Sequence, residues 1–238
     1  MYISPEVLTP ADPSDFTGRL SYHGLRAATV FDRRVDAMTR APVHHFKAGF
    51  TCGKRQVEIL VNQEFGRKQA QREARRFARV LGQLPPGVRQ SVEALWIHGG
   101  DYAAGGGNRS ILIHTGWFDG VSGETSMQEF VEETFLHEAA HTTLDSRPSG
   151  AQVMDPAIWK AAVQADAAFI STYARDNPDT EDVAESYGAY AAWLSASRSW
   201  PVAQDKETIQ HTMPQRIRAL QSLGRSFEIG ARTCPVLS

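Results

Sequence analysis

The sequence predicts an α+β protein in which a mixed or antiparallel sheet is followed by a helical half. Strand-like segments are confined to roughly the first 120 residues, and helical patterns dominate from about residue 126 onward. We expect an N-terminal extension of strands and loops (residues 1–50), a sheet lobe (about 51–120) and a helical lobe (about 121–238). A chain of 238 residues is long enough to bury a substantial core.

Three segments of the first half have the pattern of strands, and one has the pattern of a helix. In QVEILVN (56–62), Val57, Ile59 and Val61 alternate as in a half-buried strand. EFGRKQAQREARRFARVLGQL (64–84) has apolar residues at helical spacing and is ended by a proline pair. Two further strands are expected in EALWIHGG and SILIHTGWF, with the glycine-rich GGDYAAGGGN (99–108) as a flexible connector.

Four segments of the second half carry helix start signals. Ser126 and Glu129 form a capping box, and Asp155–Pro156 combines a capping aspartate with a proline in the first turn. The helices that follow the first are expected to span about residues 155–173, 179–197 and 214–223.

Composition excludes some partners. The net charge of −2 argues against nucleic acid, and the arginine-rich face of the helix at 64–84 is interpreted as a solvated surface. No apolar run approaches the ~18 residues of a membrane span. The N-terminus lacks an apolar signal core, which leaves localisation open, including export after removal of a signal. The only two cysteines, Cys52 and Cys234, are either free thiols or one long-range disulfide.

The segment FLHEAAHTTLD (135–145) contains the most specific chemical pattern. On a helix, His137 and His141 lie one turn apart on one face, so both can bind one metal ion. Glu138 is placed to take a proton from a metal-bound water. The alternative is a pair of surface histidines on an amphipathic helix.

A third ligand is required, and a carboxylate is the expected source. Arg147 occupies the position where a further histidine would extend the motif, and no histidine follows until His211. In DNPDTEDVAESYGAYAAW (176–193), Glu181 and Glu185 are spaced i, i+4 on a predicted helix. We expect Glu181 to bind the metal and Glu185 to accept a hydrogen bond from a ligating histidine, His137. The alternative is that these acids only stabilise the helix, because negative charges near its N-terminus interact favourably with the helix dipole.

HEAAH followed by EDVAE resembles the gluzincin metallopeptidases, in which a Glu-x-x-x-Glu/Asp motif follows His-Glu-x-x-His. Over about residues 110–195 the chain is most similar to lethal-factor-like catalytic domains, in which a tyrosine precedes the ligand glutamate. The resemblance implies a zincin-like fold and one zinc ion per chain, bound by His137, His141 and Glu181. It also implies that Glu138 is the general base and that Tyr173 polarises the scissile carbonyl or stabilises the oxyanion.

The predicted function is zinc-dependent hydrolysis of peptide bonds in a peptide or protein substrate. In zincin-type folds an edge strand above the active-site helix pairs with the substrate backbone, and SILIHT (110–115) is the candidate, or else an ordinary core strand. Two alternatives share these residues: an effector-type protease that cuts one specific protein, and a non-catalytic module that contains a structural zinc. If Glu181 is not the ligand, Asp166 or Asp182 is the next candidate.

Overall fold

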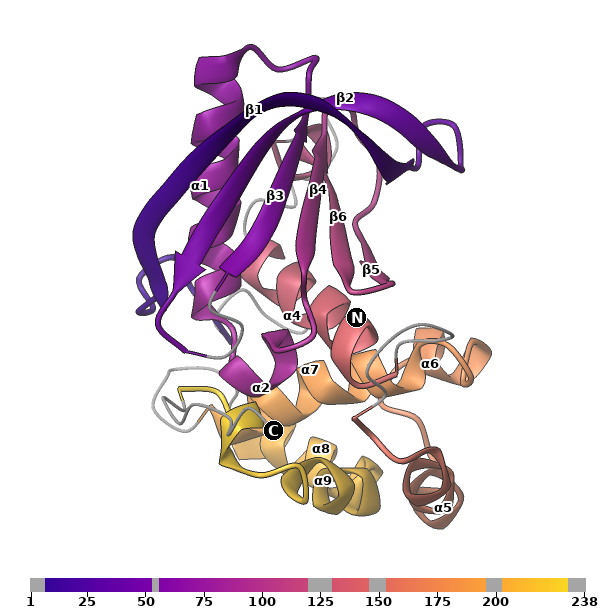
Figure 1. Ribbon diagram of the computed structural model, residues 1–238. Coiled ribbons are helices and arrows are strands. Elements are labelled where there is room, and N and C mark those ends of the chain that lie inside the picture. Colours follow the sequence, from indigo (N-terminus) through magenta and orange to yellow (C-terminus); the bar gives the residue numbers. More distant parts are fainter. Residues whose placement is uncertain (1–6, 53–55, 120–129, 146–152, 196–202, 231–238) are drawn as a thin grey trace.

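The computed structural model describes residues 7–52, 56–119, 130–145, 153–195 and 203–230. It is an α+β structure with a mixed six-stranded sheet, as the sequence predicted (Figure 1). Helices α1 and α4 lie along one face of the sheet, and the later helices gather beyond its lower end in the view of Figure 1.

The sheet combines antiparallel and parallel pairings. In order across it, the strands are β1 (Phe16–Asp32), β2 (Ala37–Phe50), β3 (Gln56–Asn62), β4 (Ala94–His98), β6 (Ser110–His114) and β5 (Gly105–Gly107). β1, β2 and β3 are antiparallel neighbours, β3, β4 and β6 run parallel, and β5 is antiparallel to β6. The segment predicted as an N-terminal extension therefore contributes two long strands to the same sheet as the later ones.

The described helices follow the start signals of the sequence in most places. They are α1 (Arg67–Gln83), α2 (Pro86–Arg89), α3 (Thr115–Asp119), α4 (Val131–Thr143), α5 (Pro156–Asp166), α6 (Thr172–Asp176), α7 (Asp182–Leu194), α8 (Ala203–Thr212) and α9 (Pro214–Gln221). The predicted strand at 56–62 and the helix at 64–84 are confirmed as β3 and α1. None of the helices in the described part of the chain is long and apolar enough to cross a membrane.

The core holds α4 in a fixed position under the sheet. Phe77 of α1 stacks on Phe135 of α4 with ring centroids 5.7 Å apart, and it also contacts Phe118 at 5.9 Å. All three rings are fully buried, and burial of a large aromatic side chain stabilises the fold by about 1.5–3 kcal/mol. Ser126 and Glu129, the predicted capping box, lie outside the described residues.

The single helix expected over 155–173 is wrong, because the chain forms two helices there. Ala167 follows α5 in the left-handed conformation with a φ of 52°, which ends the helix. Ser171 then caps α6 by accepting a hydrogen bond from the backbone N–H of Ala174. Tyr173 consequently lies in the first turn of a short separate helix. The helix expected from residue 179 begins at Asp182 instead, with Glu181 as its N-cap residue.

The glycine run Gly105–Gly107 is an edge strand, so the expectation of a flexible connector over residues 99–108 is wrong for these three residues. Gly105–Gly107 pair antiparallel with β6 at the end of the sheet. A Cβ atom at Gly106 would overlap with the backbone carbonyl of Glu138, so the absence of side chains lets β5 lie directly on α4.

SILIHT contributes the interior strand β6, so of its two alternatives the ordinary core strand is confirmed and the edge strand is wrong. β6 lies between β4 and β5, and all its residues are buried. Its near-continuous apolar sequence is typical of an interior strand covered on both faces. After β4 the chain first forms β5 at the edge of the sheet and then β6 between β4 and β5. The later strand of the two is therefore the interior one.

The structure bears on one of the two cysteines, Cys52. Cys52 is buried and disulfide-bonded, so it is not a free thiol. Cys234 lies outside the described residues.

Candidate metal centre

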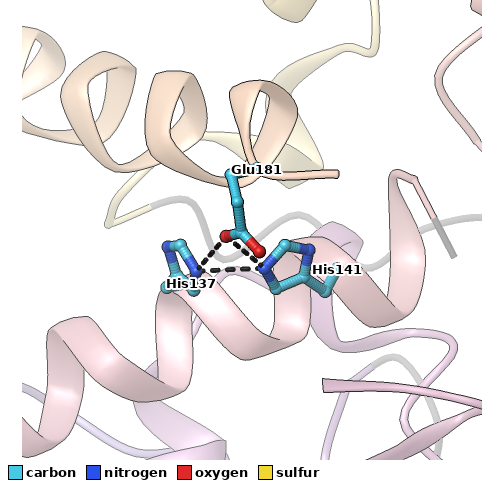
Figure 2. A group of neighbouring side chains, drawn as sticks. All are labelled: His137, His141 and Glu181. Carbon is cyan, nitrogen blue, oxygen red and sulfur yellow. Dashed lines mark hydrogen bonds and ion pairs between the residues drawn. The ribbon is translucent and has the colours of Figure 1, made fainter. Parts of the chain in front are cut away.

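Two histidines of α4 point to the same place. His137 and His141 lie one turn apart, and their Nε2 atoms are 3.0 Å from each other (Figure 2). The opposite side of α4 is fixed by packing, since Ala139 and Ala140 are fully buried. The helix therefore presents both imidazoles on its remaining accessible face, as the i, i+4 spacing requires.

The third donor comes from the start of α7. Oε2 of Glu181 lies 3.2 Å from Nε2 of His141 and 3.4 Å from Nε2 of His137. Figure 2 shows the carboxylate reaching from its own helix to the two rings. The structure thus brings together the three residues that the sequence assigned to a metal.

The spacing of the three donor atoms fits a tetrahedral zinc ion. Nitrogen and oxygen ligands about 2.0–2.1 Å from such an ion lie about 3.3–3.4 Å from one another. The separations of 3.0, 3.2 and 3.4 Å are close to that value. Two imidazoles and one carboxylate are also a donor set that catalytic zinc uses. The residues present therefore fit the ion that the sequence motif implies.

Each histidine has a carboxylate on its other ring nitrogen. Nδ1 of His141 lies 3.2 Å from Oδ2 of Asp145, and Nδ1 of His137 lies 3.6 Å from Oε1 of Glu185. A proton on each Nδ1 leaves the Nε2 lone pairs free for a metal. Glu185 is itself held by the Ser171 hydroxyl, which donates to its Oε2 at 2.5 Å.

Asp145 is a site residue that the sequence reasoning missed. It follows His141 at i+4, just beyond the end of α4, and that spacing was the signal available. Glu185 lies beside His137 as expected, at an ion-pair distance of 3.6 Å, and the predicted hydrogen bond between them stays a prediction.

The charge around His141 favours a cation. Burial lowers the pKa of His141, but the hydrogen bonds of Asp145 and Glu181 outweigh burial and raise this pKa to about 10. Burial likewise raises the pKa of Glu181, but the two histidines hold it well below its usual value. An environment that stabilises an imidazolium in this way also stabilises a metal dication at the same place.

A charged network behind the site fixes the start of α7. Asp182, the residue after the third donor, is buried and accepts from Trp159 Nε1 at 3.0 Å and from Arg216 Nε at 3.1 Å. Arg216 also pairs with Asp166 of α5 at 3.4 Å. Asp166 and Asp182, the fallback ligands, therefore bind a buried arginine instead of facing the two histidines.

A cavity of about 630 Å³ opens beside the three donors. Glu138, whose side chain is largely buried, lines it next to His137 on α4. β5, Trp117 and the loop before α7 form other parts of the wall. The cavity has room for a peptide segment next to the donors and the candidate base.

Tyr173 lines the same cavity from α6. The residue is half exposed, at 50%. The pKa of the Tyr173 hydroxyl is raised mainly by partial burial and secondly by the nearby carboxylate of Glu181. The hydroxyl therefore remains a proton donor near neutral pH.

Five other histidines of the chain lie away from this cavity. His98 and His114 are buried in the sheet and stack with ring centroids 5.4 Å apart. His44 and His45 are buried in β2, and His211 is exposed on α8. None of these five residues lines the cavity.

We found no family model, curated protein or solved structure that matches the chain. The functional interpretation rests on the geometry above and on the sequence motif.

Proposed function

We propose that the protein is a zinc-dependent peptidase that hydrolyses peptide bonds in a peptide or protein substrate. The observation that carries the proposal is the triangle of His137, His141 and Glu181 donor atoms beside a cavity that Glu138 also lines. Bound zinc would act as a Lewis acid and lower the pKa of its water towards about 7.

The chain's own residues supply the proton transfers. Glu138 accepts the proton from the attacking water and then delivers it to the departing amine. The hydroxyl of Tyr173 donates a hydrogen bond to the oxygen of the scissile carbonyl as negative charge develops there. Glu185 and Asp145 hold the two imidazoles in orientation.

β5 is the element best placed to hold an extended substrate. It ends the described sheet and lines the cavity with backbone alone, because all three of its residues are glycines. A peptide can approach such an edge closely and add a strand through main-chain hydrogen bonds.

The open side of the donor triangle favours catalysis over a structural zinc. A structural zinc uses four protein ligands. Within the described ranges, the cluster contains three donors, and the cavity lies beside them. A protease with a single protein target would use the same residues, so it differs from a broad peptidase in substrate range alone.

Metal removal tests the proposed function. We expect the purified protein to contain one zinc ion per chain, to cleave members of a mixed peptide library, to lose cleavage after chelation and to regain it with added zinc. Elemental analysis and mass spectrometry of the digests provide the measurements. Stoichiometric zinc without cleavage of any peptide or of a denatured protein mixture would favour the structural-zinc alternative.

Replacing Tyr173 with Phe should slow turnover by about 10- to 1000-fold and leave the zinc content unchanged, because one oxyanion donor is lost. Steady-state kinetics and elemental analysis check this. Tyr102→Phe is the matched control, since Tyr102 is also substantially exposed but does not line the cavity. If both variants keep the parental rate, Tyr173 has no part in the chemistry and Glu181 alone supports the gluzincin assignment.

A further inference from the structure

Arg33 lies in the tight turn that joins β1 to β2, and its neighbour holds that turn in place. Arg34 forms ion pairs with Asp32 and with Glu64, each at 2.7 Å. The contact with Arg34 lowers the pKa of Asp32 to about 2, so this pair stays charged at neutral pH. The charge of Arg34 is therefore used within the protein to stabilise the turn, whereas Arg33 takes no part in these two ion pairs.

The Arg33 side chain extends over β5 and lines the cavity beside the metal centre. A Cβ atom added at Gly105 would lie 2.9 Å from Nη2 of Arg33, so the guanidinium lies against the strand because glycine leaves room for it. No hydrogen bond or ion pair joins the Arg33 side chain to any residue that the structure describes. Its five N–H donors are available to a ligand.

The other charges of the cavity make this arginine distinctive. Among the described residues that line the cavity, Arg33 is the only lysine or arginine, whereas the carboxylates are Glu138, Asp145, Asp179, Glu181 and Glu185. Three of these carboxylates lie close to the ligating histidines. A substrate carboxylate would be repelled by most of the wall and attracted only near Arg33.

We propose that Arg33 binds a carboxylate of the peptide that lies along β5, and so makes the cavity selective for one acidic position near the scissile bond. The carboxylate is either an aspartate or glutamate side chain or the C-terminus of the peptide, since both present the same planar pair of oxygens to a guanidinium. This inference rests on the proposed peptidase function for the identity of the ligand as a peptide.

The selectivity is positional. An acidic residue strengthens binding at the place that faces Arg33 and weakens binding at places that face the acidic wall. The rest of the substrate contacts a glycine strand, which offers no side chains of its own to select among residues. Arg33 therefore carries a large share of the discrimination along this edge.

Binding to a protein that cannot turn over tests the proposal without relying on catalysis. The probes are alanine-based hexapeptides with a neutral fluorophore, each with Asp, Asn or Lys at one position, and each with either a free or an amidated C-terminus. Fluorescence anisotropy measures their affinity for zinc-loaded Glu138→Gln protein and for the same protein with Arg33→Gln or Arg33→Glu. Arg40→Glu is the matched control, because Arg40 is exposed on the same hairpin but lies outside the cavity.

We expect one Asp position, or the free C-terminus, to bind at least about tenfold more tightly than its Asn or amide counterpart. Arg33→Gln should abolish that preference and leave the neutral peptides within about twofold. Arg33→Glu should reverse it towards Lys, and Arg40→Glu should leave it intact. The Asn and amide arms identify which source of the carboxylate is used.

Equal affinity for Asp, Asn and amidated peptides at every position would overturn the role of Arg33. The same conclusion would follow if Arg33→Gln lowered the affinity for all peptides equally, or if no peptide bound measurably. To separate the two proposals, the same peptides are incubated with zinc-loaded protein that retains Glu138, and their cleavage is measured. An Arg33-dependent preference without cleavage would refute the peptidase function and retain the carboxylate site, whereas cleavage without the preference would do the opposite.

Discussion

Glu138→Gln should reduce kcat by about 100-fold or more while the protein keeps its zinc. Glutamine preserves the shape of the side chain and can still form hydrogen bonds, but it cannot accept the proton of the attacking water. Glu138 lies outside the donor triangle, so its replacement leaves all three donor atoms in place. Turnover of a cleavable peptide and elemental analysis of the same sample separate loss of chemistry from loss of metal.

Glu133→Gln is the matched control for that variant. Glu133 lies on the same helix five residues earlier, is buried, and accepts a hydrogen bond from the backbone N–H of Leu8. Burial raises the pKa of Glu133 to about 7, so an amide replaces a carboxyl that is already partly protonated at neutral pH. We expect Glu133→Gln to retain activity. If Glu138→Gln is equally active, the general base has been misassigned.

Glu181→Ala should abolish stoichiometric zinc binding and, with it, all cleavage. The substitution leaves two imidazoles, and removal of the third donor also removes the carboxylate that helps to stabilise the cation. His137→Ala and His141→Ala should have the same effect. Titration with a competing zinc chelator measures the affinity, and circular dichroism verifies that the fold is kept.

Two further variants make the zinc result specific to Glu181. Glu185→Gln should weaken zinc binding by about 10- to 100-fold, because in the proposed site the Glu185 carboxylate orients His137 without binding the metal. Asp176→Ala removes an exposed carboxylate from nearby α6, whose ion pair is with Arg175, and should bind zinc normally. Full zinc occupancy in Glu181→Ala would remove Glu181 from the ligand set and transfer the search to residues outside the three-donor cluster.

The elements that the sequence located correctly depend on local periodicity. α1 and β3 follow from the spacing of apolar residues along a single segment, such as Ala70, Ala74 and Phe77, which are all fully buried on one side of α1. The pairing of His137 with His141 has the same origin. Residues one turn apart on a helix share a face regardless of the tertiary structure, so the five-residue motif HEAAH was sufficient to predict that the two imidazoles lie close together.

The errors occurred where neighbours in space are distant in sequence. β5 was interpreted as part of a connector. Glycine is needed there because the backbone of α4 approaches closely at Gly106, and no local pattern indicates that contact. The sequence left open whether SILIHT is an edge or a core strand for a related reason. The order of strands in a sheet depends on where each segment of the chain adds to the sheet, and it need not follow the order of the segments in the sequence.

The sequence by itself determined that His137 and His141 share one face of a helix with Glu138 beside them, and it predicted a carboxylate donor from a later helix. Only the tertiary structure decided how the neighbouring acids Glu181 and Asp182 divide their roles. Glu181, the N-cap residue of α7, directs its carboxylate towards the histidines, while Asp182, the first residue of the helix, turns inward to Trp159 and Arg216. The two carboxylates are chemically almost identical, and what distinguishes them is the buried cation on one side of the backbone and the two imidazoles on the other.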